Sequence, residues 1–131
     1  MQHRLFVYGT LQIPERVKQI IGRAVSGEPA TLDGYRCGLV ERADFPGIVP
    51  EQNSQVSGQV LFGLTQPELA LLDQYEGELY QRIRVNVQHN QQLVCWVYTM
   101  MPWAYARVTN EPWTIQWYQG QKGKVRLTYR T

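Results

Sequence analysis

Two short segments of this chain combine residue types that can bind anions or exchange protons. In the first, Tyr8, Gly9, Thr10 and Leu11 follow an apolar run. Gly9 lets the backbone turn sharply and lets a ligand approach closely. Successive backbone N–H groups at such a turn can bind a carboxylate or an oxyanion. Four residues alone also fit an ordinary strand-to-loop turn, so this segment is only a candidate anion site.

The second segment places carboxylates where a helix end disfavours them. Asp73, Glu76 and Glu78 surround the stop of a predicted helix at Gly77, and the last carbonyls of a helix carry partial negative charge. Together with its like-charged neighbours, this environment would raise the pKa of Glu76 and suit it to proton transfer near neutral pH. Two alternatives stay open. Glu76 is a solvated acid beside a left-handed glycine, or an arginine of the following strand pairs with the cluster.

Other reactive residue types are too scattered to suggest a site. His3 and His89 lack ligand spacing and an acidic partner, so we expect no bound metal. Cys37 and Cys95 are far apart and are predicted to be reduced thiols, Cys95 within an apolar strand. None of the serines lies in a nucleophile elbow, so no catalytic triad is indicated.

Two helices should position the candidate segments. Pro14 near the start and Gly22 at the end bracket apolar residues at helical spacing, which predicts a short helix between them. Further on, Thr65 is a predicted N-cap, followed by Pro67 and by Glu68 at the third helical position. This second helix should run up to the glycine of the acidic segment.

The remaining pattern is that of strands. Residues 3–8 are β-branched and aromatic, and 56–64 alternate, which predicts a strand in each range. Residues 80–100 are predicted to form a hairpin around the turn HNQQ. Glycines and prolines interrupt 30–52, which suggests bent strands joined by loops. Strands and two short helices in mixed order predict an α+β fold with a curled sheet or small barrel.

Bulk properties bound the remaining possibilities. With 131 residues we expect one domain over 1–131, although no secondary structure can be assigned to 102–131. A net charge of +2 indicates no obligatory polyanion partner. The sequence contains neither a signal peptide pattern nor an apolar run of membrane-spanning length, which favours a cytoplasmic protein without a membrane partner.

Three motifs in order resemble one known family. These are FVYGTL near the N-terminus, FPGIVP at 45–50, and LLDQYEGELYQRIRVNV, which ends at residue 87. Taken together they resemble the gamma-glutamylcyclotransferase-like family over roughly residues 4–100. The resemblance does not extend to the last thirty residues.

The resemblance implies a fold, a reaction and a set of site residues. The fold is a small mixed β-barrel with flanking short helices. The reaction is release of 5-oxoproline and a free amine from a small gamma-glutamyl substrate, without metal or organic cofactor. The resemblance assigns substrate binding to Tyr8, Gly9, Thr10 and Leu11. It assigns acid–base catalysis to Glu76 and supporting roles to Tyr80 and Arg82. The identity of the leaving amine and the oligomeric state stay open.

Two other functions are compatible with the sequence. A protein of this fold could bind a small ligand without catalysing its cyclisation. The C-terminal segment also interleaves aromatic and cationic side chains, as single-stranded nucleic-acid binding proteins do; they are Trp113, Trp117, Tyr118, Lys122, Lys124, Arg126, Tyr129 and Arg130. The same pattern fits aromatic residues that complete the core beside solvated cations. We therefore expect no nucleic-acid partner.

Overall fold

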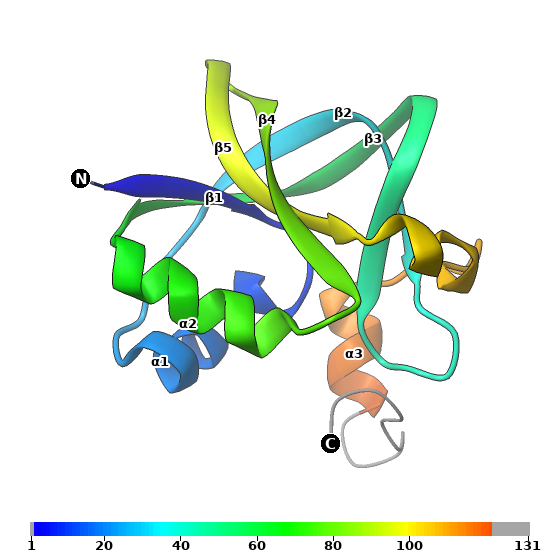
Figure 1. Ribbon diagram of the computed structural model, residues 1–131, viewed down its shortest axis with the longest axis horizontal. Coiled ribbons are helices and arrows are strands. Elements are labelled where there is room, and N and C mark those ends of the chain that lie inside the picture. The colour runs from blue at the N-terminus through cyan, green and yellow to red at the C-terminus, as the bar shows by residue number, and fades with distance from the viewer. Residues whose placement is uncertain (1, 122–131) are drawn as a thin grey trace.

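The computed structural model describes residues 2–121, and its centre is a closed five-stranded barrel (Figure 1). The strands are β1 (His3–Val7), β2 (Glu28–Leu39), β3 (Pro46–Leu64), β4 (Tyr80–His89) and β5 (Gln91–Met100). Their order around the barrel is β1-β3-β2-β4-β5. Because β1 pairs antiparallel with β3 but parallel with β5, the barrel is mixed, as predicted.

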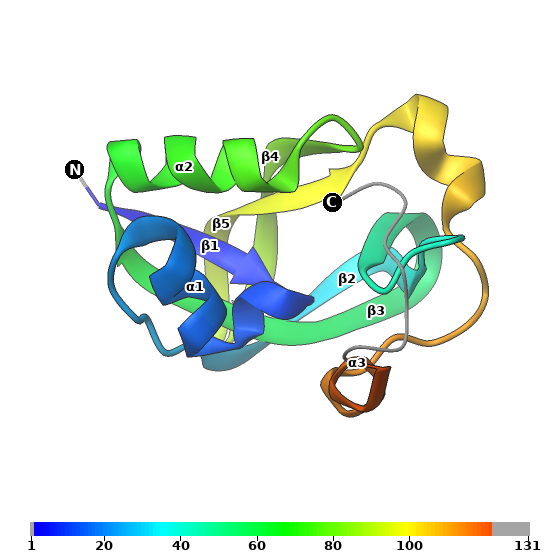
Figure 2. The same cartoon turned by 90° about the horizontal axis from the view of Figure 1, so that it is seen from below.

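Short helices flank the barrel. They are α1 (Pro14–Ile21), α2 (Gln66–Glu76) and α3 (Ile115–Gln121), with 3₁₀ turns η1 (Thr10–Gln12) and η2 (Pro102–Arg107). The predicted capping box is present at the start of α2: Thr65 Oγ1 accepts from the Glu68 N–H, and Glu68 accepts from the Thr65 N–H. Figure 2 shows α1 and α2 together beside β1, while α3 lies apart from them, below the β2–β3 ribbon.

The glycine-rich region forms two long strands, β2 with a bend and β3, joined by a loop over 40–45, which agrees with the prediction of bent strands joined by loops. β2 and β3 pair from Glu28↔Val60 to Leu39↔Pro46, and β3 includes residues 56–64, predicted as a separate strand. The register shifts next to Gly34, which has a φ of 84°. Glycine takes this conformation without strain, so the break in the pattern bends β2 and does not end it.

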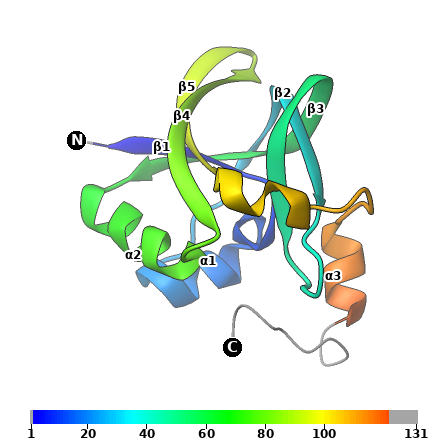
Figure 3. The same ribbon diagram turned by 45° about the vertical axis from the view of Figure 1, so that its right-hand side comes forward.

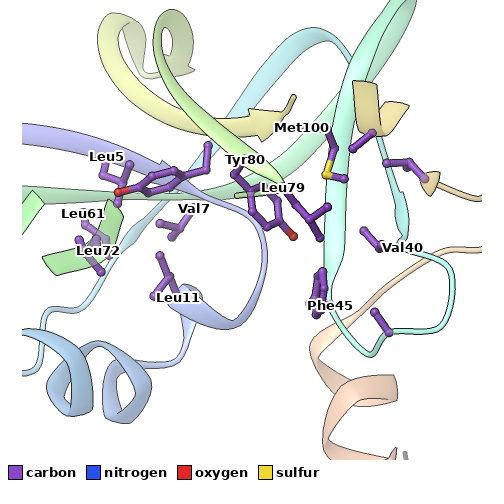
Figure 4. Close-up of a cluster of buried hydrophobic side chains, with 14 of the residues drawn as sticks. Leu5, Val7, Leu11, Val40, Phe45, Leu61, Leu72, Leu79, Tyr80 and Met100 are labelled. Carbon is purple, nitrogen blue, oxygen red and sulfur yellow. The ribbon is translucent and has the colours of Figure 1, made fainter. Parts of the chain in front are cut away.

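Two apolar clusters occupy the two faces of the barrel wall. The inner cluster draws on all five strands, and β1 contributes Phe6 and Tyr8 to it. The alternate residues of β1, Leu5 and Val7, face the outer cluster, which α1 and α2 cover. Figure 4 shows part of this outer cluster, including Leu11 next to Val7. Strand alternation therefore gives β1 two buried faces.

Residues 102–121 have the defined structure that the sequence left unassigned. After η2, the chain runs beside the end of β2, where Val40 bridges Val108 and the Leu39 N–H donates to the carbonyl of Glu111 at 2.9 Å. α3 follows, and in Figure 3 it lies to the right of the lower end of the β2–β3 ribbon. Trp113, just before α3, is buried, and its Nε1–H donates to the carbonyl of Asp44 at 2.7 Å.

Gly58 provides a test of how tightly the barrel closes. A Cβ at this position would overlap the carbonyl oxygen of Val7 and would lie 2.8 Å from a ring carbon of Phe6. We predict that Gly58→Ala lowers the free energy of unfolding by about 2 kcal/mol, because β1 is paired on both sides and cannot move away. Denaturant titration measures this change. Gly120→Ala is the control, since a Cβ there meets nothing within 4 Å; equal midpoints for the two variants would contradict the prediction.

Candidate active site

The two candidate segments meet at one pocket at the end of β1. Its empty volume, including the open mouth, is about 340 Å³. The residues that line it are Phe6, Val7, Tyr8, Gly9, Thr10, Leu11, Phe45, Pro46, Glu76, Tyr80 and Tyr98. All the predicted site residues except Arg82 are therefore in its wall. Arg82 lies in an adjoining hollow that shares Glu76, Tyr80 and Tyr98 with the pocket.

The loop after β1 turns at Gly9, where the chain passes from the strand into η1. Gly9 has a φ of −117° and a ψ of −139°, a conformation that is neither helical nor extended. A Cβ on Gly9 would lie 3.0 Å from Cγ of Pro46. Thr10 then begins η1, and the first N–H groups of such a turn have no partner within it. The anion site at residues 8–11 stays a prediction.

A hydrogen-bonded chain connects this loop to three helices. Thr10 Oγ1 lies 3.1 Å from Tyr75 Oη, on α2 directly before Glu76. Arg16, on α1, donates to Tyr75 Oη and to Tyr118 Oη, both at 2.7 Å. Because Tyr118 belongs to α3, one guanidinium group fixes the relative positions of α1, α2 and α3 below the pocket.

The acidic cluster is divided into residues with different surroundings. Asp73 is paired with Arg82, which donates to its two oxygens at 2.7 and 3.1 Å. Tyr98 Oη donates to the same carboxylate at 2.7 Å. Glu78 is exposed. The structure thus selects the alternative in which an arginine pairs with the cluster. This pairing offsets one of the like charges on which the predicted pKa of Glu76 depends, and that pKa stays a prediction.

The pKa values of Asp73 and Tyr98 follow from this contact. Burial would raise the pKa of Asp73, but the hydrogen bonds from Arg82 and Tyr98, together with the charge of Arg82, outweigh it and leave the pKa below its usual value. Burial is the main cause that raises the pKa of Tyr98, followed by the hydrogen bond to Asp73 and the charges of Asp73 and Glu76. Near neutral pH, Asp73 is therefore ionised and Tyr98 is protonated.

The hydroxyl groups of the three tyrosines in the pocket wall all donate to protein acceptors. Tyr8 donates to the carbonyl of Tyr98 at 2.5 Å, and Tyr80 donates to the carbonyl of Pro46 at 2.6 Å. The third, Tyr98, donates to Asp73. These hydrogen bonds hold the pocket wall together.

The helix end before the site differs from the predicted left-handed stop. Gly77 has a φ of 79° with a ψ of −159°, which is a positive φ outside the left-handed helical region. Its N–H still donates to the carbonyl of Asp73 at 3.2 Å. Glycine is the residue that tolerates this conformation, and the extended ψ directs the chain away from the helix toward β4.

Sequence reasoning missed several residues of the pocket, most notably Tyr98. It lies in the apolar run of β5, where every residue looks like core. The hairpin register pairs Tyr98 with Arg82 across β4 and β5. A register derived from the predicted hairpin would have placed the tyrosine beside a motif residue, which is the signal that could have identified it.

The described residues offer little else that could be reactive. Within residues 2–121, no three His, Cys, Asp or Glu side chains are placed to share a metal ion. Burial is the main cause that raises the pKa of Cys37 to about 12, so its thiol is protonated. None of the helices in this part of the chain has the length and apolarity needed to span a membrane.

The aromatic and cationic pattern of the C-terminal segment is only partly described. Trp113 and Tyr118 are buried, and their tilted rings are in contact with centroids 5.9 Å apart. This agrees with the reading in which the aromatic residues complete the core. The other members of the pattern at 122–131, Lys122, Lys124, Arg126, Tyr129 and Arg130, lie outside the described residues.

Arg16 supports a prediction about the stability of this region. Arg16→Met keeps the aliphatic stem but removes the donors to Tyr75 and Tyr118. We expect the free energy of unfolding to fall by about 2 kcal/mol and amide exchange in α3 to accelerate, because two part-buried hydroxyl groups lose a charged partner. Lys18→Met, at an exposed position of the same helix, is the matched control. Unchanged exchange in α3 would show that this contact does not hold the helix.

Comparison with known proteins places the chain in a family. The sequence model described as "Gamma-glutamyl cyclotransferase, AIG2-like" matches residues 5–118, beyond the limit of about residue 100 that the motifs indicated. AIG2-like protein B of Arabidopsis thaliana is 38% identical over 85 residues, which are 65% of this chain and 49% of that protein. The chain thus spans about half the length of that curated relative.

Solved structures share the fold. The solution structure of an Arabidopsis thaliana protein is 31% identical, with a TM-score of 0.76 over 94% of this chain and 85% of that one. A structure of a gamma-glutamyl cyclotransferase is 16% identical, with a TM-score of 0.66 over 100% of this chain and 92% of that one, and shows the fold alone. By its sequence over residues 5–118, the chain belongs to the AIG2-like gamma-glutamyl cyclotransferase family.

Proposed function

We propose that this protein converts a gamma-glutamyl amine derivative into 5-oxoproline and a free amine, with Glu76 as the acid–base residue. One observation carries the proposal: Glu76 and the loop of residues 8–11 line a single pocket, although they are far apart in the sequence. A carboxylate and an array of backbone donors are the two groups that an intramolecular cyclisation requires. Membership of the family supports the same reaction.

The first step would be attack of the substrate's own α-amine on its γ-carbonyl carbon. At neutral pH this amine is mostly protonated and has no lone pair for attack. Glu76 would take one proton from it as general base. The new C–N bond closes a five-membered ring, and the electron pair of the C=O bond moves onto oxygen. Because the reaction is intramolecular, holding the substrate folded supplies much of the rate.

The second step would break the original amide bond. The pair of electrons on oxygen re-forms the carbonyl, and the bond to the leaving nitrogen breaks. Protonated Glu76 would return its proton to that nitrogen, so the carboxylate is regenerated. The ring nitrogen must also lose its second proton, which passes to the departing amine, so the products are a neutral lactam and an ammonium ion. The backbone N–H groups of residues 8–11 would stabilise either the oxyanion or the α-carboxylate of the substrate.

The rest of the pocket would serve this chemistry indirectly. Phe6, Leu11 and Phe45 present apolar surface, which excludes water and strengthens the interactions of Glu76. Tyr80 fixes the wall through its bond to Pro46. Arg82 pairs with Asp73, so its support of the site would be indirect.

Glu76→Gln tests the assignment of the acid–base residue. We expect 5-oxoproline release to fall by at least about 10²-fold, because the amide cannot exchange the proton, while the denaturant midpoint stays close to that of the wild type. The substrates are gamma-glutamyl amino acids, gamma-glutamyl-ε-lysine and glutathione, with chromatographic detection of 5-oxoproline.

Glu78→Gln is the matched control, since Glu78 is an exposed acid two residues away; its activity should stay within about twofold. Full activity in a folded Glu76→Gln protein would refute the role of Glu76. Binding of gamma-glutamyl compounds by the wild type without any 5-oxoproline would favour the non-catalytic alternative.

A further inference from the structure

The hollow beside the pocket contains Asp73 and Tyr98, which have no assigned role, next to Arg82. We propose that Asp73 and Arg82 position Tyr98 so that its hydroxyl oxygen accepts a hydrogen bond from the α-ammonium group of the substrate. The identity of the ligand rests on the proposed function. The position of the binding group rests on the contacts of Tyr98.

The set begins with a guanidinium group that is held on two sides. Arg82 lies over the ring of Trp96, 4.2 Å from its centroid, and donates to both oxygens of Asp73. A fork-like pair of hydrogen bonds fixes the orientation of a carboxylate as well as its distance. Stacking on tryptophan removes the freedom that an arginine side chain usually has. The Asp73 carboxylate is therefore held in one orientation toward its second partner, Tyr98.

The orientation of Asp73 determines what Tyr98 can offer to a ligand. An ionised carboxylate has only acceptor positions, so the Tyr98 hydroxyl must be the donor in their 2.7 Å contact. Its single proton is committed, and only lone pairs remain on Oη. A phenol with a free rotor could donate or accept. Here Asp73 restricts Tyr98 to the role of acceptor.

The charges around Tyr98 specify the group that would fit there. Tyr98 and Glu76 line both the pocket and the adjoining hollow, and the negative charge of Glu76 acts on the Tyr98 hydroxyl. The charge of Arg82 is matched by Asp73. A ligand group between a carboxylate and a fixed acceptor should be a cation with several donors. A primary ammonium group has three donors, whereas a carboxylate would be repelled.

This arrangement gives the site two chemically different ends. The loop of residues 8–11 supplies donors, and Tyr98 with Glu76 supplies acceptors. The substrate would therefore lie with its ammonium group toward Tyr98 and its anionic oxygen toward the loop. In that orientation, Glu76 lies at the end where the amine must lose its proton.

The test compares two ligands that differ only in the α-amine. The probes are N5-methyl-L-glutamine and N-methylglutaramic acid, with affinities measured by calorimetry and 5-oxoproline assayed in the same samples. We expect the wild type to bind the amine probe at least about tenfold more tightly than the other probe. Tyr98→Phe should remove most of this preference, because it lacks the acceptor, with a loss of about tenfold. Affinity for N-methylglutaramic acid should change little.

A double-mutant comparison tests whether Asp73 acts through Tyr98. Asp73→Asn should also reduce the preference, and the double variant should be no worse than Tyr98→Phe alone. Glu78→Gln is the control and should keep the wild-type preference. Additive losses would assign Asp73 an independent role and overturn the positioning proposal.

The remaining outcomes separate this proposal from the proposed function. Equal binding of both probes by the wild type, or an unchanged preference in Tyr98→Phe, would overturn the ammonium site whether or not 5-oxoproline forms. A Tyr98-dependent preference without 5-oxoproline would support the ammonium site and count against the reaction. Binding of neither probe would overturn the ammonium site, and 5-oxoproline in the same samples would then decide the reaction separately.

Discussion

Closure of the barrel through β1 is the constraint on which the rest of the structure depends. This strand of five residues pairs antiparallel with β3 and parallel with β5, so both of its edges are satisfied and both of its faces are buried. Because β1 is held on both sides, the loop of residues 8–11 that follows it has a fixed position. The parallel register, Phe6↔Val97, brings Tyr8 to Tyr98, and the pocket forms where these two strands end.

The acidic helix end shows how tertiary contacts redistribute charge. Three carboxylates at a helix C-terminus would be unfavourable if all were solvated in the same way. In the folded chain, Asp73 pairs with Arg82, Glu78 is exposed, and Glu76 lines the pocket. Asp73 is stabilised as an anion by Arg82 and Tyr98, and this pairing in turn fixes a hydroxyl group beside Glu76. The carboxylates that looked alike in the sequence therefore have different surroundings in the folded chain.

Much of the local structure was predictable because it depends on short-range physics. The capping box at Thr65, the helix stop at Gly22 and the hairpin over β4 and β5 follow from hydrogen bonds and side-chain alternation within a few residues. The bend at Gly34 agrees with the predicted bent strands, and pairing with β3 continues β2 through it. The prediction failed for residues 56–64, which continue the strand that begins at Pro46 and do not form a separate one. The contact that a Cβ on Gly9 would make with the distant Pro46 could not be read from the sequence either.

The candidate site likewise has features that depend on local sequence and features that depend on the tertiary structure. The sequence alone determined which residues could carry acid–base chemistry and anion binding, since those properties belong to the side chain and to the local backbone. Its motifs also indicated the family. Only the tertiary structure brought Glu76 to the loop of residues 8–11 and Tyr98 into the wall of the same pocket. These juxtapositions depend on barrel closure, which is set by contacts between segments far apart in the chain. Tyr98 therefore looked like an ordinary core residue until its partners were known.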